Sequence, residues 1–225
     1  MPPVPLPFSC AAIIVAAGSS RRMGFDKLAA ELDGMPVLKR TILALASADS
    51  ISSIVVVCPL ERWKNLGPLE ISKPLRRVDG GKERQDSVAA GLAALDADVS
   101  CIAVHDGARP LVSAADIDRC IASAQVHRAS SLARRVTETV KRSTPDDFCA
   151  DAVSRENLWF METPQVFELS LLRRAYETLT IAVTDEVSAV EMLGVPVKFV
   201  ESTAPNLKIT TPGDLALASA LLKSR

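Results

Sequence analysis

Buried strands and amphipathic helices alternate along most of this chain. Residues 10–17 form a continuous apolar run that ends at Gly18, which is typical of a strand buried on both faces of a parallel sheet. Apolar positions at helical spacing follow in residues 36–46, and residues 52–58 form a second apolar run. This pattern predicts a strand-helix-strand unit.

The same alternation continues toward the end of the chain. The other expected strands are residues 75–78, 101–104 and 197–200. The other expected helices are residues 85–95, 114–124, 169–178, 186–193 and 212–222, the last of them capped by Thr211. This order, in a chain long enough for one substantial core, predicts a single α/β domain over residues 1–225 with a mainly parallel sheet.

The regular alternation of expected strands and helices stops near Ser130. Residues 131–142 have strand-like content but include several charges, and no clear helix follows before Leu169. We therefore expect an arm or hairpin that projects from the sheet.

Charge and hydropathy exclude two classes of partner. The chain has 26 Lys and Arg against 27 Asp and Glu, so it lacks the general positive field that attracts nucleic acids and anionic membranes. No run of about 18 uncharged apolar residues suggests a membrane span, and residues 1–9 lack the features of a signal peptide. Any recognition of phosphate must be local.

Cysteine and histidine usage indicates a reducing compartment. The five cysteines are widely spaced, none forms a C-x-x-C pair, and most lie in apolar runs where a thiol acts as a small hydrophobe. With only two histidines, the sequence argues against structural zinc. We expect a cytoplasmic protein.

The loop after the first strand carries the strongest chemical signal. It begins with four small residues, Ala16, Ala17, Gly18 and Ser19. Small residues let backbone N–H groups approach phosphate oxygens, while Arg22 and Lys27 can neutralise charge on a phosphorus under attack. The loop matches neither the P-loop nor the dinucleotide spacing, and taken alone it can also be a turn with solvated cations.

A second constellation ends the expected strand at residues 101–104. Asp106 can hold or orient a hard divalent cation, and the planar fork of Arg109 can take a phosphate. The alternative is an Asp–Arg ion pair that closes a turn, with His105 packed beside it.

Two weaker segments complete the set. In residues 79–87, two glycines precede a helix, so exposed backbone at Gly81 can contact a base edge while Ser87 adds a hydroxyl. Lys208 is expected on a short strand before the last helix. A tight turn and a solvated lysine are the respective alternatives.

Together, and in this order, the four segments resemble the 2-C-methyl-D-erythritol 4-phosphate cytidylyltransferases of the non-mevalonate isoprenoid pathway over nearly the whole chain. The resemblance implies a Rossmann-like sheet of the nucleotide-diphospho-sugar transferase type with a protruding β-arm. It implies a homodimer that joins CTP to 2-C-methyl-D-erythritol 4-phosphate with Mg²⁺ or another divalent cation. The products are 4-diphosphocytidyl-2-C-methyl-D-erythritol and pyrophosphate.

The resemblance also implies roles for individual residues. The A-A-G-x-x-x-R-M loop holds the CTP phosphates, with Arg22 and Lys27 beside the reacting phosphorus. The G-G-x-x-R-x-x-S segment places Gly81 and Ser87 at the cytosine and ribose.

The two remaining motifs supply the acceptor side. The H-D-[AG]-A-R-P segment gives Asp106 a nucleotide and metal role and Arg109 an acceptor role. The N-[IL]-K-[IV]-T segment adds Lys208 to the catalytic cations. The implied arm is residues 133–165, whose Thr139, Arg155 and Thr163 contact the acceptor of the neighbouring subunit.

The sequence departs from the family pattern at two places. Val15 stands where many relatives have proline, and residues 25–28 replace a commoner proline-lysine-glutamine, which partly resembles molybdenum-cofactor nucleotidyltransferases. Ribitol 5-phosphate cytidylyltransferase is the nearest alternative, although residues 107–110 favour the erythritol enzyme. A nucleotide-binding regulator without turnover would need a missing cation or acid, and all the expected ones are present. The failed dinucleotide spacing disfavours a dehydrogenase.

Overall fold

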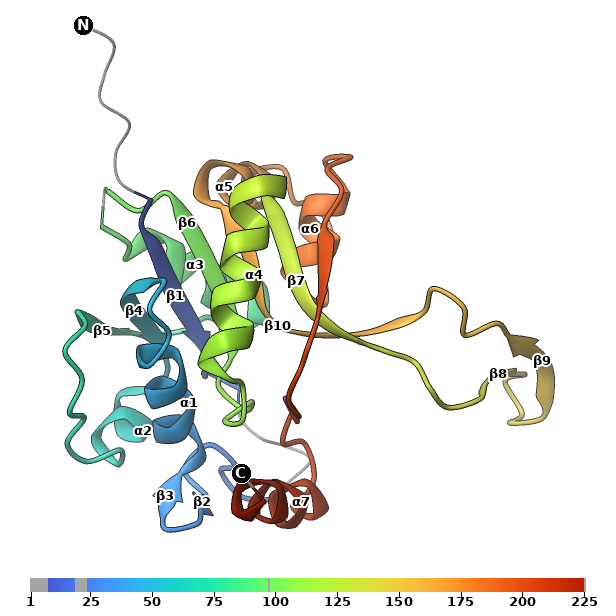
Figure 1. Cartoon of the computed structure of the whole chain (residues 1–225), viewed down its shortest axis with the longest axis horizontal. Helices are drawn as coiled ribbons and strands as arrows, with labels where there is room; N and C mark the ends of the chain where they lie inside the picture. Colours follow the sequence, from blue (N-terminus) through green and yellow to red (C-terminus); the bar gives the residue numbers. More distant parts are fainter. Residues whose placement is uncertain (1–7, 19–23, 97, 225) are drawn as a thin grey trace, which may run out of the picture.

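The central feature of the computed structural model, which describes residues 8–18, 24–96 and 98–224, is a seven-stranded sheet (Figure 1). Its strand order is β11-β7-β10-β6-β1-β4-β5. The strands are β1 (Cys10–Val15), β4 (Ile51–Val57), β5 (Leu75–Val78), β6 (Cys101–Asp106), β7 (Ala129–Arg135), β10 (Trp159–Glu168) and β11 (Lys198–Glu201). β10 runs antiparallel to both β6 and β7, and the other pairs are parallel. The expected mainly parallel α/β fold is confirmed.

Helices cover both faces of this sheet (Figure 1). One face carries α1 (Val37–Ala46) and α4 (Ala114–His127), and the other carries α3 (Arg84–Ala93), α5 (Leu169–Glu177) and α6 (Glu186–Glu191). The short α2 (Leu60–Lys64) follows β4, and α7 (Pro212–Lys223) ends the fold against the small hairpin of β2 (Glu31–Leu32) and β3 (Met35–Pro36). The sequence pattern did not predict α2 or this hairpin.

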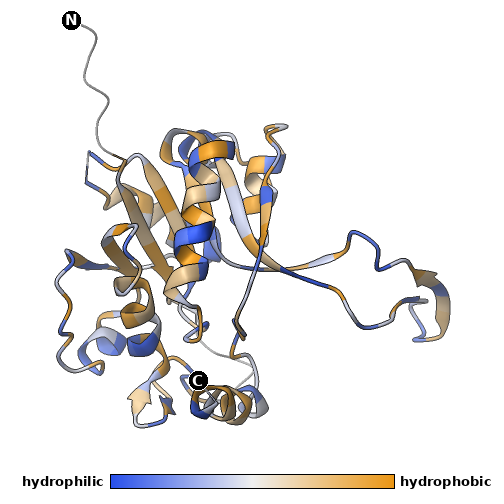
Figure 2. Ribbon diagram, viewed as in Figure 1, coloured by the Kyte–Doolittle hydropathy of each residue, from blue (hydrophilic) through white to orange (hydrophobic). Residues whose placement is uncertain are grey.

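The apolar run of β1 separates two hydrophobic cores. Ile14 packs with Leu38 and Ile42 on the α1 face, whereas Ile13 packs with Val88 on the α3 face. Successive residues of a strand point to opposite faces, so a strand covered on both sides must be apolar at every position. Figure 2 shows this as strands that are hydrophobic along their length in the centre of the molecule.

The projecting arm is shorter than the expected 133–165. Residues 133–135 pair with residues 159–161 inside the central sheet, so only residues 136–158 project, ending in the hairpin of β8 (Val140–Ser143) and β9 (Cys149–Val153) (Figure 1). Arg134 lies 4.2 Å above the Phe160 ring and Arg135 lies 4.3 Å above the Trp159 ring. Cation–π stacking therefore lets charged residues occupy the end of a strand.

The expected short strand around Lys208 is wrong. Residues 205–210 belong to no strand and instead cross between β11 and α7. Their backbone is fixed by other contacts, among them the Ile209 N–H donated to the Ala108 carbonyl at 2.9 Å.

Two further findings concern the chain as a whole. Across the described ranges, no helix is long and apolar enough to cross a membrane. The five cysteines are unpaired, and four of them are buried, whereas Cys149 is exposed on β9.

Candidate active site

A cavity of about 760 Å³ opens at the carboxyl ends of β1 and β6. The chain passes from β1 to β4 and β5 on one side and returns to β6 on the other, so these neighbouring strands form the switch point at which open α/β sheets bind ligands. The cavity brings together most of the residues expected from sequence: Ala16, Ala17, Gly18, Lys27, Gly81, Ser87, Asp106 and Lys208. Ser19 and Arg22 lie outside the described residues.

Gly80 lets the second loop pack closely against the first. A Cβ at this position would lie 2.4 Å from the Ala17 Cβ and 2.7 Å from the Ser87 Oγ, distances that real atoms do not tolerate. The absence of a side chain thus brings Gly81 and Ser87 beside the loop that follows β1.

Asp106 is a buried anion surrounded by three cations. Its Oδ2 lies 2.8 Å from the Lys208 Nζ and 3.4 Å from the Arg109 Nε, and its Oδ1 lies 3.5 Å from the Arg84 Nη2. Burial alone would raise the pKa of Asp106, but the charges of Lys208, Arg84 and Arg109 outweigh it and hold that pKa well below its usual range. Asp106 is therefore ionised at neutral pH and fixes the positions of the cations.

Arg84 is the cation that sequence reasoning missed. It lines the cavity, and its Nη1 donates to the Oε1 of Glu186, a fully buried carboxylate that also accepts from the Tyr176 hydroxyl at 3.1 Å. Burial alone would lower the pKa of Arg84. The charge and hydrogen bond of Glu186 outweigh burial and raise this pKa above its ordinary value, so the side chain stays cationic. Arg84 is the arginine of the G-G-x-x-R segment, so the sequence did contain a signal that could have identified it.

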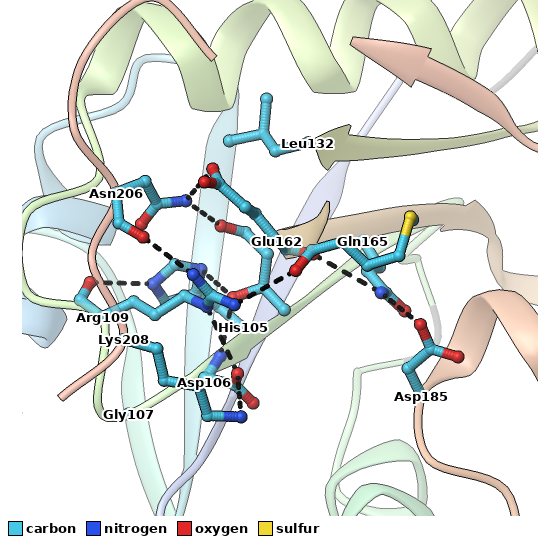
Figure 3. A network of polar contacts seen from close by, with 12 residues as sticks. His105, Asp106, Gly107, Arg109, Leu132, Glu162, Gln165, Asp185, Asn206 and Lys208 are labelled. Carbon is cyan, nitrogen blue, oxygen red and sulfur yellow. Dashed lines mark hydrogen bonds and ion pairs between the residues drawn. The ribbon is translucent and has the colours of Figure 1, made fainter. Parts of the chain in front are cut away.

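A polar network holds the segment that carries Lys208 (Figure 3). The Arg109 Nη1 donates to the Asn206 carbonyl at 2.7 Å. The Asn206 amide donates in turn to the Glu162 Oε2 at 3.1 Å and to the Thr163 carbonyl at 2.7 Å. Buried polar groups need such partners, so the network fixes Lys208 beside Asp106 without regular secondary structure.

Thr163 belongs to the same protomer's site and not to the projecting arm. Its Oγ1 accepts the Asp106 N–H at 3.1 Å, which leaves its hydroxyl proton for the Nδ1 of His105 at 3.0 Å. The His105 Nε2 can then donate to the Arg109 carbonyl at 3.2 Å. β10 places Thr163 beside β6 and next to Asp106 of its own protomer, whereas the resemblance assigned it to the acceptor of the neighbouring subunit.

Burial lowers the pKa of His105 to about 4, although its hydrogen bond to Arg109 acts in the opposite direction. An unfolded histidine titrates near 6.5, so the unfolded chain binds more protons between these values and stability falls as pH drops through that window. We expect His105 to remove about 2 kcal/mol of unfolding free energy between pH 7 and pH 5.

Urea unfolding at the two pH values checks this expectation. His105→Asn should flatten the pH dependence, whereas the exposed His127→Asn should keep the wild-type slope. Equal slopes for the two variants would contradict a neutral buried His105.

Lys27 extends toward the segment that carries Lys208. Its Nζ donates to the Ile209 carbonyl at 2.8 Å, which links the loop after β1 to the chain before α7. Lys27 and Lys208 therefore line one cavity from two distant parts of the sequence.

Thr139 and Arg155 lie away from this cavity. Both are exposed on the projecting arm, and Arg155 donates to the Thr137 carbonyl within it. Arg109 does not line the cavity itself but forms an ion pair with Asp106, and it lines a neighbouring hollow together with Arg134 and Lys208. Within one protomer, the structure does not bring the two arm residues to the site.

The comparisons with known proteins agree with this geometry. A sequence model of the 2-C-methyl-D-erythritol 4-phosphate cytidylyltransferase family matches residues 10–224. The chain belongs to this family. The family member from Pelotomaculum thermopropionicum is 41% identical, with 96% of this chain and 94% of that protein covered. The chloroplastic member from Oryza sativa subsp. japonica is 36% identical, with 96% and 75% covered.

Solved structures of family members share the fold. The 4-diphosphocytidyl-2C-methyl-D-erythritol synthase of Anaerococcus prevotii superposes with a TM-score of 0.85 at 28% identity, with 96% of this chain and 99% of that chain covered. The 2-C-methyl-D-erythritol 4-phosphate cytidylyltransferase of Thermus thermophilus gives 0.79 at 30% identity, with 96% and 100% covered.

Proposed function

We propose that this chain joins CTP to 2-C-methyl-D-erythritol 4-phosphate, giving 4-diphosphocytidyl-2-C-methyl-D-erythritol and pyrophosphate in isoprenoid precursor synthesis. Membership of the family assigns the reaction. The main support for locating the reaction in this cavity is its charge. Three cations converge there with the ionised Asp106 at the switch point of the sheet: Lys27, Lys208 and Arg84. Such a cavity suits a polyanionic nucleotide.

The chemistry follows from the charges. An oxygen of the acceptor phosphate attacks the α-phosphorus of CTP in line; a new P–O bond forms as the bond to the β-phosphate oxygen breaks, and pyrophosphate leaves. The nucleophile is already an anion at neutral pH, so no general base and no covalent enzyme intermediate are needed. The barrier lies in bringing two anions together, and Lys27 and Lys208, with Arg22 by resemblance, lower it.

A divalent cation fits the site as a companion of the nucleotide. Among the residues that the structure describes, no group of three or more His, Cys, Asp or Glu side chains can hold a metal. Asp106 is one carboxylate in the cavity, and Mg²⁺ commonly combines one carboxylate with substrate phosphates. When bound with CTP, Mg²⁺ would neutralise charge on the triphosphate, and Asp106 is the side chain that would meet it.

Pyrophosphate release tests the function. CTP and Mg²⁺ are mixed with the enzyme and with 2-C-methyl-D-erythritol 4-phosphate, ribitol 5-phosphate or no acceptor. We expect release with the erythritol phosphate alone. Release with ribitol 5-phosphate would assign the chain the ribitol 5-phosphate cytidylyltransferase activity. No pyrophosphate release with either acceptor would contradict the proposal.

Gly80→Ala tests how closely the segment before α3 packs against the loop that follows β1. The new methyl group would overlap Ala17 and Ser87, so we expect KM for CTP to rise about 10-fold and stability to fall by about 1–3 kcal/mol. Steady-state kinetics and thermal unfolding measure the two effects. Gly213→Ala is the matched control because its nearest neighbour, the Thr211 Oγ1, lies 3.9 Å from the added Cβ. Equal behaviour of the two variants would contradict the packing argument.

We also propose that two subunits exchange their arms, with Thr139 and Arg155 reaching the acceptor in the partner's site. The projecting segment 136–158 supports this, because it exposes Phe148 to 73% and the adjoining β10 exposes Phe160 to 40%. Exposed aromatic residues on a projecting hairpin are typical of an interface.

Mixed dimers distinguish contacts between subunits from contacts within one. A purified heterodimer of Lys27→Ala and Arg155→Ala subunits has one native site if the arm crosses over, and we expect about half of the wild-type turnover per dimer. If each arm served its own subunit, both sites would be defective and the heterodimer would be as inactive as the two homodimers. Failure to form a heterodimer would contradict the exchange itself.

The proposed compartment is the cytoplasm. The unpaired cysteines support it, because thiols stay reduced there.

A further inference from the structure

Arg62 is a buried arginine that the proposed mechanism does not use. It lies on the five-residue helix α2, is 8% exposed and does not line the nucleotide cavity. A buried guanidinium is costly unless acceptors surround it, so its partners indicate what it does.

All three guanidinium nitrogens contact the chain around the proposed nucleotide loop. The Nη1 donates to the Ala16 carbonyl, and the Nη2 donates to the Gly18 carbonyl at 3.2 Å. The Nε donates to the Asp26 Oδ2 at 2.8 Å. One side chain therefore connects the residues directly after β1 to the residue directly before Lys27.

Asp26 completes the connection on the other side of Lys27. Its Oδ1 accepts the Leu28 N–H at 3.0 Å, and its carbonyl accepts the N–H groups of Ala29 and Ala30 at 3.2 and 3.0 Å. The backbone that carries Lys27 is thus fixed at its start and at the turn that follows. Asp26 also lies in the segment that departs from the family pattern.

The contacts have an electrostatic consequence for the cavity. Ala16 and Gly18 line it, and their carbonyl oxygens carry partial negative charge that would oppose a triphosphate. Engaging both carbonyls with a guanidinium offsets this charge and fixes the backbone at Ala16 and Gly18 before the nucleotide arrives.

We propose that Arg62 and Asp26 are positioning residues that hold Ala16, Gly18 and Lys27 in the geometry that binds the CTP phosphates. The proposal rests on the assignment of this cavity to CTP. Arg62 acts through the backbone of Ala16 and Gly18 and through Asp26, without touching the nucleotide.

Arg62→Met removes the donors and retains a side chain of similar length. Affinities for CTP and for inorganic tripolyphosphate are measured by calorimetry without acceptor, and both KM values are measured by pyrophosphate release. We expect Kd and KM for the nucleotide to rise about 10- to 100-fold, and KM for the acceptor to stay within about 2-fold. Asp26→Asn should act in the same direction, and the double variant should lose less than the two single effects combined.

Arg76→Met is the matched control. Arg76 also pairs with an aspartate and a carbonyl, Asp96 at 3.2 Å and Ala94 at 2.7 Å, but its side chain is 55% exposed on β5. This variant should keep wild-type affinity for both probes. If Arg62→Met does not fold, Arg62→Lys and Asp26→Asn replace it, and each should show the same selective loss.

Three results would overturn the proposal. The first is a folded Arg62 variant whose affinities for CTP and tripolyphosphate stay within about 2-fold of wild type. The second is a parallel rise of both KM values with a lowered melting temperature, which would mean general destabilisation. The third is a wild-type protein that binds neither probe. A wild-type protein that binds CTP but releases no pyrophosphate would contradict the proposed function and still allow the test of Arg62.

Discussion

Lys27→Ala is expected to lower kcat by about 10²- to 10³-fold while the protein stays folded, because it removes one cation from a preorganised cluster around the reacting phosphorus. The Lys27 Nζ lies in the cavity at the end of β1, 2.8 Å from the Ile209 carbonyl. The acceptor of this hydrogen bond is neutral and the site is partly buried, so losing the bond should lower the unfolding free energy by about 1 kcal/mol. Single-turnover pyrophosphate release with saturating CTP measures the chemical step.

Lys39→Ala is the control for this variant. The Lys39 Nζ also donates to a backbone carbonyl, that of Pro68 at 2.7 Å, but it lies on α1 outside the cavity. It should retain wild-type turnover. A purified Lys27→Ala enzyme with at least about a tenth of wild-type turnover would exclude Lys27 as a catalytic residue.

Asp106→Asn is expected to lower kcat/KM by at least about 100-fold and the unfolding free energy by about 2 kcal/mol. The amide keeps the shape of the side chain but leaves Lys208, Arg109 and Arg84 without their shared anion. These cations would then repel one another and move from the positions that receive phosphate. In the wild type, the contribution of ionised Asp106 to the unfolding free energy should persist at pH 5, because its pKa is depressed. This contribution is lost only as pH falls through that low pKa.

Kinetics and urea unfolding of Asp106→Asn measure the two effects. Asp96→Asn removes an exposed partner of Arg76 and should change neither. An Asp106→Asn enzyme with more than about a third of wild-type kcat/KM would show that the anion does not organise the cations.

The sequence was informative wherever a feature repeats or follows a strand. The unbroken apolar run of β1 predicted a strand buried on both faces, and Ile13 and Ile14 do pack into opposite cores. Because parallel strands end at the same edge of a sheet, the motifs after the expected strands at residues 10–17 and 101–104 were expected at one site. The cavity contains residues from both, among them Gly18 and Asp106.

Features made by single long-range contacts were not predictable. Arg62 lies on a helix too short for a periodic signal, and its partner Asp26 is 36 residues away. Arg84 depends on Glu186, which is 102 residues further along the chain. Their pairing is decided by tertiary packing, which charge patterns along one segment do not encode.

The errors in the arm and around Lys208 have local causes. Arg134 and Arg135 suggested the start of an irregular arm, yet both continue β7 because aromatic rings of β10 cover them. The apolar residues around Lys208 suggested a strand, but Ile209 bonds to the turn at Ala108 and not to a strand edge.

β10 joins the arm to the chemical centre without an intervening loop. The strand begins at Trp159, directly after the projecting segment, and four residues later Thr163 contacts both Asp106 and His105. The pairing of β10 with β7 changes register between Met161 and Gln165, so the contact of Thr163 with Asp106 depends on how this irregular part of β10 is held. If the arms exchange between subunits, the contacts of each arm with the neighbouring subunit also help to position the Asp106 of the subunit that carries the arm. Separating the two subunits would then disturb both centres, even where every catalytic side chain is intact.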